Sequence, residues 1–128
     1  MNRSGILLFA HGARDPAWAR PFEVVADRLR ERASASGDEV MLAFLELMTP
    51  GIAEAGAELV SKGCSRITVV PLFLGAGGHV RKDLPRLLED LQRRHPDVRW
   101  TLSGAVGETD VLIQALVDAA WQLAQPED

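Results

Sequence analysis

The sequence predicts an α/β fold built on a four-stranded parallel sheet with helices on both faces. Two observations support this prediction. Four short apolar runs alternate with segments whose apolar residues recur at helical spacing. The runs are apolar throughout rather than alternating with polar residues, which is typical of parallel strands that are buried on both faces.

The expected strands span residues 5–10, 39–45, 66–74 and 98–102. A helix is expected after Asp15 and Pro16, because an acidic cap followed by proline favours a first helical turn. The pair Thr49-Pro50 predicts the start of a second helix, which stops at Gly63. The third helix carries leucines at positions 84, 87, 88 and 91. The last helix opens at residues 109–110 and continues through residue 121.

Right-handed crossovers between parallel strands favour a small flavodoxin-like sheet with the strand order 2-1-3-4. The chain has 128 residues and contains no internal repeat, linker or low-complexity segment. We therefore expect one domain over residues 1–128, with a disordered tail at residues 125–128.

Composition excludes several classes of function. The net charge of −4 argues against a non-specific nucleic-acid binder, which needs a basic face. The first apolar run is too short to span a membrane and breaks at His11 and Gly12. Cys64 is the single cysteine and cannot form a disulfide within the chain, which fits a reducing compartment. We expect a cytoplasmic protein that binds neither nucleic acid nor membranes.

Three residues with metal-binding or basic side chains follow the expected strands. His11 follows the first strand, Glu46 follows the second, and His79 follows the glycine-rich stretch 75–78 after the third. Open α/β sheets bind ligands at the carboxyl ends of their strands. The order 2-1-3-4 places these residues on neighbouring strand ends, and the glycines let the loop that carries His79 fold inward.

Two imidazoles and a carboxylate suit Co²⁺, Ni²⁺, Fe²⁺ and Zn²⁺, and they leave coordination positions open. The same groups accept protons near neutral pH. A lone histidine on a loop is usually just solvated, but two of the three histidines share this edge with a glutamate. A non-catalytic metal-binding or metal-delivery module and an anion-binding domain that uses the glycine loop are the alternatives. Dinucleotide, phosphate-loop and serine-nucleophile motifs are incomplete in this sequence.

Three sequence blocks resemble the class II tetrapyrrole chelatases. His11-Gly12-Ala13-Arg14 is similar to their HGSR-type opening, and residues 43–46 are similar to their A-[FY]-L-E segment. Residues 71–74 with Gly78, His79, Val80 and Asp83 resemble their P-x-F-L…G-x-H…D block. The resemblance covers nearly the whole chain and is to the short, single-lobe sirohydrochlorin cobaltochelatases, the small CbiX type, which are related to ferrochelatase. Ala13 departs from the usual serine, which removes a hydroxyl group but no ligand.

This resemblance implies a chelatase-like lobe that inserts a divalent metal, Co²⁺ first and Ni²⁺ or Fe²⁺ as alternatives, into sirohydrochlorin. His11, Glu46 and His79 are carried over as catalytic and metal-handling residues. No cofactor is implied beyond the substrate metal. The longer chelatases that this chain resembles build their cleft from two lobes, so a homodimer is expected. The residues expected to contact the tetrapyrrole are Arg14, Gly77, Gly78, Arg81 and Lys82.

Overall fold

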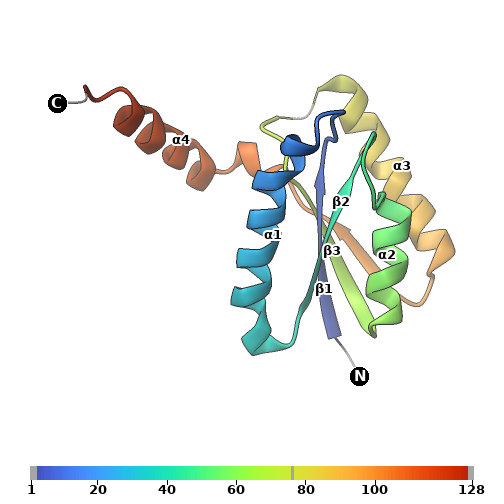
Figure 1. The fold of residues 1–128 in the computed structure, drawn as a ribbon. Helices are drawn as coiled ribbons and strands as arrows, with labels where there is room; N and C mark the ends of the chain where they lie inside the picture. The colour runs from blue at the N-terminus through green and yellow to red at the C-terminus, as the bar shows by residue number, and fades with distance from the viewer. Residues whose placement is uncertain (1–2, 76, 127–128) are drawn as a thin grey trace.

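The computed structural model describes residues 3–75 and 77–126, apart from the side chain of His79. Four parallel strands form one sheet in the order β2-β1-β3-β4, as the sequence predicts (Figure 1). All the strand pairs are parallel. The strands are β1 (Arg3–Ala10), β2 (Glu39–Phe44), β3 (Cys64–Pro71) and β4 (Arg99–Leu102).

Four α-helices follow the four strands, and three short 3-10 turns lie beside two of these helices, α1 and α4. The α-helices are α1 (Ala19–Ala33), α2 (Ile52–Ser61), α3 (Gly78–Arg94) and α4 (Asp110–Leu123). The 3-10 turns are η1 (Pro16–Trp18), η2 (Ser34–Ser36) and η3 (Val106–Glu108). Asp15 caps η1 through its side chain, which accepts a hydrogen bond from the amide of Ala17 at 2.9 Å. Thr109 caps α4 in the same way, so the predicted cap at Asp15 and the predicted start of the last helix at residues 109–110 are both confirmed.

Two helix starts differ from the prediction. The cap of α2 is Gly51 rather than Thr49, and Glu54 reaches back to the Gly51 amide at 3.4 Å. α3 begins at Gly78, so the backbone of His79 lies in the first helical turn and not in a flexible loop. Residues 127 and 128 of the expected disordered tail lie outside the described residues, and the state of the tail stays a prediction.

The face of the sheet under α2 and α3 is well covered. Leu7, Ile67 and Trp100 from the sheet pack there with Leu59 of α2 and Leu91 of α3, and all five are 5% exposed or less. Position 56 has to be small, because a side chain added there would press against the Leu91 side chain and the Trp100 ring. This layer is the main hydrophobic core.

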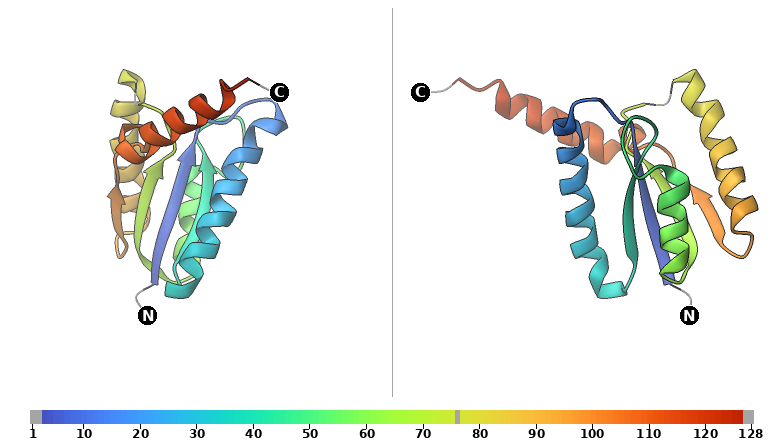
Figure 2. Two further views of the ribbon diagram at one scale, coloured as in Figure 1. Left: turned by 90° about the vertical axis from the view of Figure 1, so that its left-hand side faces the viewer. Right: turned by 45° about the vertical axis from the view of Figure 1, so that its right-hand side comes forward.

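The opposite face is covered over only half of its width. α1 packs over β1 and β2, where Leu8, Ala26, Val40 and Phe44 form a second buried cluster. α4 does not complete this layer, because it projects away from the sheet (Figures 1 and 2). The β3–β4 half of this face therefore has no covering helix in the described part of the chain. None of the described helices is both long and apolar enough to cross a membrane.

Truncating Leu59 to alanine should destabilise the fold strongly. Leu59 is fully buried between α2 and the sheet, and deletion of such a side chain costs about 2–5 kcal/mol in unfolding free energy. Urea denaturation followed by circular dichroism measures this loss. The exposed control Glu31→Ala should change stability by less than about 0.5 kcal/mol. Equal effects in the two variants would contradict the assigned core.

Cys64 should react slowly with thiol reagents in the folded protein. Burial, with a further contribution from the Glu39 carboxylate, raises the pKa of the Cys64 thiol. The reactive thiolate therefore forms only at higher pH than in the unfolded chain. Alkylation rates measured from pH 7 to 10, with and without urea, should show the native profile displaced to higher pH. Coincident profiles would show that the thiol is accessible and unperturbed.

Candidate functional site

His11 and Glu46 lie side by side at the carboxyl edge of the sheet. β1 and β2 run parallel with Ala10 opposite Phe44, so the residues that follow both strands leave the sheet at the same edge. The amide of Leu45 continues the pairing by donating to the carbonyl of Ala10 at 2.8 Å. The Nδ1 atom of His11 then lies 3.2 Å from Oε1 of Glu46, within hydrogen-bond distance.

A close backbone contact holds this pair together. A side chain at Gly12 would overlap the carbonyl oxygen of Glu46 and press on the amide of Met48. Only glycine allows the two loops to approach this closely. Leu47 completes the turn in the left-handed region, with φ of 67°. His11 therefore supplies the imidazole, and Gly12 leaves room for the loop that carries Glu46.

Two aromatic residues hold the position of His11. The imidazole lies against the ring of Phe73, with centroids 4.6 Å apart and planes inclined by 34°. The indole Nε1 of Trp18 donates a 2.7 Å hydrogen bond to the carbonyl of His11. The sequence predicts a strand at Phe73 and a helix after Pro16 that includes Trp18, and neither contact with His11 follows from that prediction. No local pattern signals them, because they join residues from three separate segments.

The hydrogen bond to Glu46 determines how His11 can act. An ionised carboxylate only accepts hydrogen bonds, so Nδ1 of His11 carries the proton in this pair. The Nε2 atom of the neutral ring then holds the free lone pair, which is the form that ligates a metal. Both side chains are more than 40% exposed, so a metal ion can reach them from solvent.

An apolar cavity opens beside His11. Its volume is about 390 Å³, within the range of small-molecule sites. His11 is the titratable group among the residues that line it, and the others offer apolar or backbone surface. The lining residues are His11, Trp18, Phe22, Leu72, Phe73, Leu74 and Gly75. This combination suits a flat apolar ring with a reacting centre near the imidazole.

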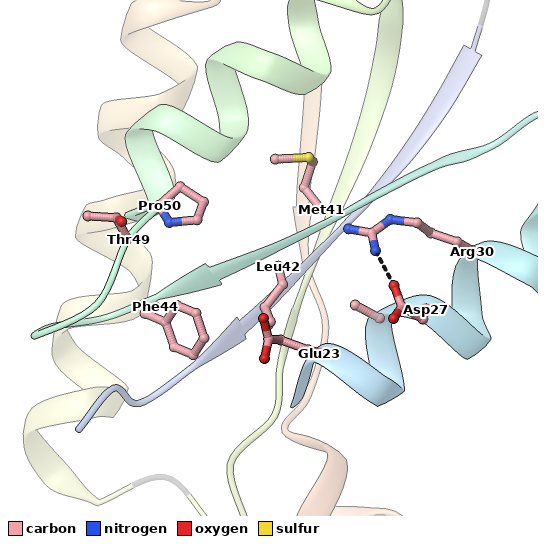
Figure 3. Close-up of a pocket in the computed structure, with 9 residues that line it drawn as sticks. Glu23, Asp27, Arg30, Met41, Leu42, Phe44, Thr49 and Pro50 are labelled. Carbon is pink, nitrogen blue, oxygen red and sulfur yellow. Dashed lines mark hydrogen bonds and ion pairs between the residues drawn. The ribbon is translucent and has the colours of Figure 1, made fainter. Parts of the chain in front are cut away.

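Another cavity, of about 270 Å³, lies along the edge strand β2 (Figure 3). An ion pair between Arg30 and Asp27, at 2.8 Å, borders it together with Met41 and Phe44. Neither His11 nor Glu46 lines this cavity. Its arginine and aspartate neutralise each other on the surface, so we assign it no role in the chemistry of the His11–Glu46 pair.

The structure describes the other predicted site residues only incompletely. The backbone of His79 lies in the first turn of α3, and its side chain lies outside the described residues. Gly77 is the N-cap of α3 and Gly78 its first residue. Among the described side chains, no group of three histidines, cysteines or carboxylates is placed to hold a metal. The described part of the site is therefore the His11–Glu46 pair.

The three predicted cations lie on two segments, and none of them lines the cavity beside His11. Arg14 is exposed and follows the close contact at Gly12, while Arg81 and Lys82 lie in α3 just after His79. Of the apolar residues after Glu46, Leu47 is exposed and Met48 packs against the cluster under α1. Met48 is therefore a packing residue, and Leu47 is the one available to a ligand or partner.

Comparisons with known proteins agree with this arrangement. Residues 5–122 match the model of the CbiX family. A sirohydrochlorin cobaltochelatase of Saccharolobus solfataricus is 39% identical over 84 residues, which are 66% of this chain and 62% of that protein. The chain thus spans less than two thirds of the length of this relative. A sirohydrochlorin cobaltochelatase of Sulfurisphaera tokodaii is 36% identical over 88 residues, which are 69% of this chain and 70% of that protein.

Solved structures of similar proteins share the fold. A CbiX protein from Marinobacter aquaeolei VT8 superposes with a TM-score of 0.77 at 33% identity, covering 93% of this chain and 95% of that chain. SirB from Bacillus subtilis, solved with Fe³⁺, superposes with a TM-score of 0.80 at 25% identity, covering 97% of this chain and 48% of that chain. Since the family model spans most of the sequence and the fold agrees, the chain belongs to the CbiX family.

Proposed function

We propose that this protein is a metal chelatase that inserts a divalent metal ion, Co²⁺ in the first place, into sirohydrochlorin. The observation that carries the proposal is the His11–Glu46 pair, exposed at the carboxyl edge of the sheet beside an apolar cavity. The names of the Saccharolobus and Sulfurisphaera relatives support the same reaction. The metal is a substrate in this reaction, and we propose no resident cofactor.

The reaction needs a metal ligand and a proton acceptor close together. A divalent ion has to lose water as it enters the ring, and two pyrrole N–H protons have to leave. The free Nε2 of His11 offers one ligand and leaves other coordination positions open to the ring nitrogens. Glu46 holds the His11 ring in orientation and supplies a carboxylate that can accept a departing proton. His79 is proposed as a further ligand from the first turn of α3.

Charge on the protein suits the substrate. Sirohydrochlorin carries several carboxylates around an apolar ring, and the cavity beside His11 offers mostly apolar surface. Arg14 follows the loop that carries His11, and Arg81 and Lys82 follow His79 in α3, so all three positive charges lie close in sequence to predicted site residues. Gly77 and Gly78 open α3, where backbone amides favour an anion such as a carboxylate. We propose that these five residues bind the carboxylates of the tetrapyrrole.

We propose that the active protein is a cytoplasmic homodimer. The chain matches 48% of SirB and nearly all of the Marinobacter protein, so it corresponds to one lobe of the longer chelatase. Ligand pockets usually bury about 70–90% of their ligand, which a single sheet edge does not achieve for a broad ring. A second copy would close the cleft, and Leu47, 63% exposed beside Glu46, would lie in the shared wall. The free thiol of Cys64 fits a reducing cytoplasm.

An insertion assay tests the proposal. Metal-free sirohydrochlorin is mixed with the protein and with Co²⁺, Ni²⁺ or Fe²⁺, and the absorption spectrum reports conversion to the metal complex. Conversion well above the protein-free rate is expected, with Co²⁺ preferred. Metal binding measured by calorimetry without acceleration for any of the three ions would favour the alternative, a metal-delivery module, and would refute the chelatase proposal.

The variant Glu46→Gln should insert metal more slowly and bind it more weakly. Glutamine keeps an oxygen that can accept from Nδ1 of His11, but it removes the negative charge and the proton acceptor. Loss of the carboxylate partner of a metal-binding histidine typically costs about 10–100-fold in affinity or activity. Initial rates and Co²⁺ titrations measure the two effects, with Glu31→Gln as the control. Rates equal to those of the control would make Glu46 a bystander.

Replacing His79 by alanine should nearly abolish insertion and leave the fold intact. Alanine has the highest helix propensity, so it does not disturb the first turn of α3. We expect almost no insertion above the protein-free rate, because a ligand of the metal is lost, with an unchanged circular dichroism spectrum. The control is His95→Ala, which removes the histidine at the opposite end of α3, where the ring lies on Trp100. Near-normal turnover in folded His79→Ala protein would refute its role as a ligand.

A further inference from the structure

Trp18 contacts both the cavity beside His11 and the backbone of His11 itself. Its side chain is 43% exposed and lines this cavity. The indole Nε1 donates a 2.7 Å hydrogen bond to the carbonyl oxygen of His11. Tryptophan combines a large apolar ring with one hydrogen-bond donor, so one side chain can hold an apolar ligand and a polar backbone group together. Trp18 therefore joins the space for a ligand to the residue expected to handle the metal.

The indole of Trp18 is held in place before a ligand arrives. Asp15 closes η1 with two hydrogen bonds, one from the amide of Ala17 to its carboxylate at 2.9 Å and one from the amide of Trp18 to its carbonyl at 3.0 Å. The indole then lies against Phe22, with ring centroids 5.5 Å apart. Phe22 in turn meets the buried Phe44 of β2 edge-on, at 6.5 Å. This chain of three rings anchors Trp18 to the packed layer of α1 and β2.

The cavity suits the face of a tetrapyrrole better than its edge. Among the described residues that line the cavity, none is an arginine or a lysine, and most offer apolar surface. The carboxylates around the ring would lose their water there without gaining a charged partner, which is unfavourable. The flat conjugated ring gains by leaving water, and it can stack on aromatic side chains. The ring is therefore expected to enter with its face toward the aromatic wall that Trp18 and Phe22 form.

His11 is held at three points, and Trp18 controls one of them. Glu46 fixes the tautomer of the imidazole, Phe73 lies against the imidazole ring, and the indole N–H fixes the backbone carbonyl. Phe73 lines the cavity as well, but its side chain has no hydrogen-bonding group. Glu46 does not line the cavity. Trp18 is therefore the one of these three residues that can contact a bound ring and hold His11 through a hydrogen bond.

We propose that Trp18 is a substrate-binding and positioning residue of the chelatase. Its indole ring stacks on the face of the tetrapyrrole, and its N–H sets the distance between that ring and the backbone of His11. Correct placement of a reacting group contributes strongly to the rate of a reaction, and small displacements are costly. The inference rests on the proposed insertion reaction and adds the residue that aligns the ring with the metal ligand.

Two substitutions at position 18 separate the ring from its N–H. Trp18→Phe keeps an aromatic ring in the wall and removes the donor, so kcat should fall by ~5- to 10-fold, the effect of one hydrogen bond. The dissociation constant of metal-free sirohydrochlorin, measured by its fluorescence, should change by less than ~3-fold, because stacking is kept. Trp18→Leu removes the flat ring as well, and this dissociation constant should rise by a further ~3- to 10-fold. Initial insertion rates with Co²⁺ give kcat.

Trp100→Phe is the matched control. The indole N–H of Trp100 also donates to a histidine carbonyl, that of His95, at 3.3 Å, but this contact lies at the carboxyl end of α3. Neither Trp100 nor His95 lines the cavity beside His11. Trp100 is 5% exposed, so its substitution disturbs the core at least as much as Trp18→Phe does. Trp100→Phe should lower Tm by at least as much as Trp18→Phe and leave kcat and the dissociation constant unchanged.

The possible outcomes distinguish the role of Trp18 from the proposed reaction. Insertion by the wild type with an unchanged kcat in Trp18→Phe overturns the positioning role, and the reaction stands. An unchanged dissociation constant in Trp18→Leu shows that the ring binds elsewhere and overturns the stacking role. A fall in kcat of equal size in Trp100→Phe shows that lost stability explains the effect and overturns the positioning role too. A wild type without insertion activity refutes the reaction itself, and the role of Trp18 with it.

Discussion

The parallel pairing of β1 with its neighbours is the constraint on which the site depends. Because Ala10 lies opposite Phe44 in two strands that run the same way, His11 and Glu46 leave the sheet at one edge. An antiparallel β2 of six residues would place Glu46 at the far end of the sheet, about 20 Å away. Helical crossovers enforce the parallel direction, so the helices determine the geometry of the site without contributing its histidine–carboxylate pair.

Two glycines allow close backbone contacts at the carboxyl edge of the sheet, one on each side of β1, that a side chain would block. Gly12 brings the loop after β1 against the loop after β2, and Gly107 brings the loop after β4 against the end of β3. The first contact holds the His11–Glu46 pair, and the second sets the direction of α4. The same type of contact therefore positions both the His11–Glu46 pair and the start of α4, and each depends on a residue without a side chain.

The sequence predicted the strand order and the meeting of His11 and Glu46 at one edge, because these follow from local patterns and from the handedness of crossovers. It missed features that depend on tertiary contacts. The start of α2 at Gly51 follows a turn in which Leu47 adopts a left-handed conformation, which the pair Thr49-Pro50 does not reveal. Phe73 was read as strand core, yet its ring lies against His11 from a segment beyond the end of β3. Periodicity carries no information about such contacts between distant segments.

The sequence pattern of α4 does not determine the direction in which this helix leaves the sheet. A largely apolar helix has the same sequence pattern whichever apolar surface it covers. The direction of α4 depends on the connection before it, where the amide of Gly107 holds η3 on the end of β3 and Thr109 caps the first turn of the helix. The direction in which α4 leaves the sheet is thus set by this short connection and not by the sequence pattern of the helix.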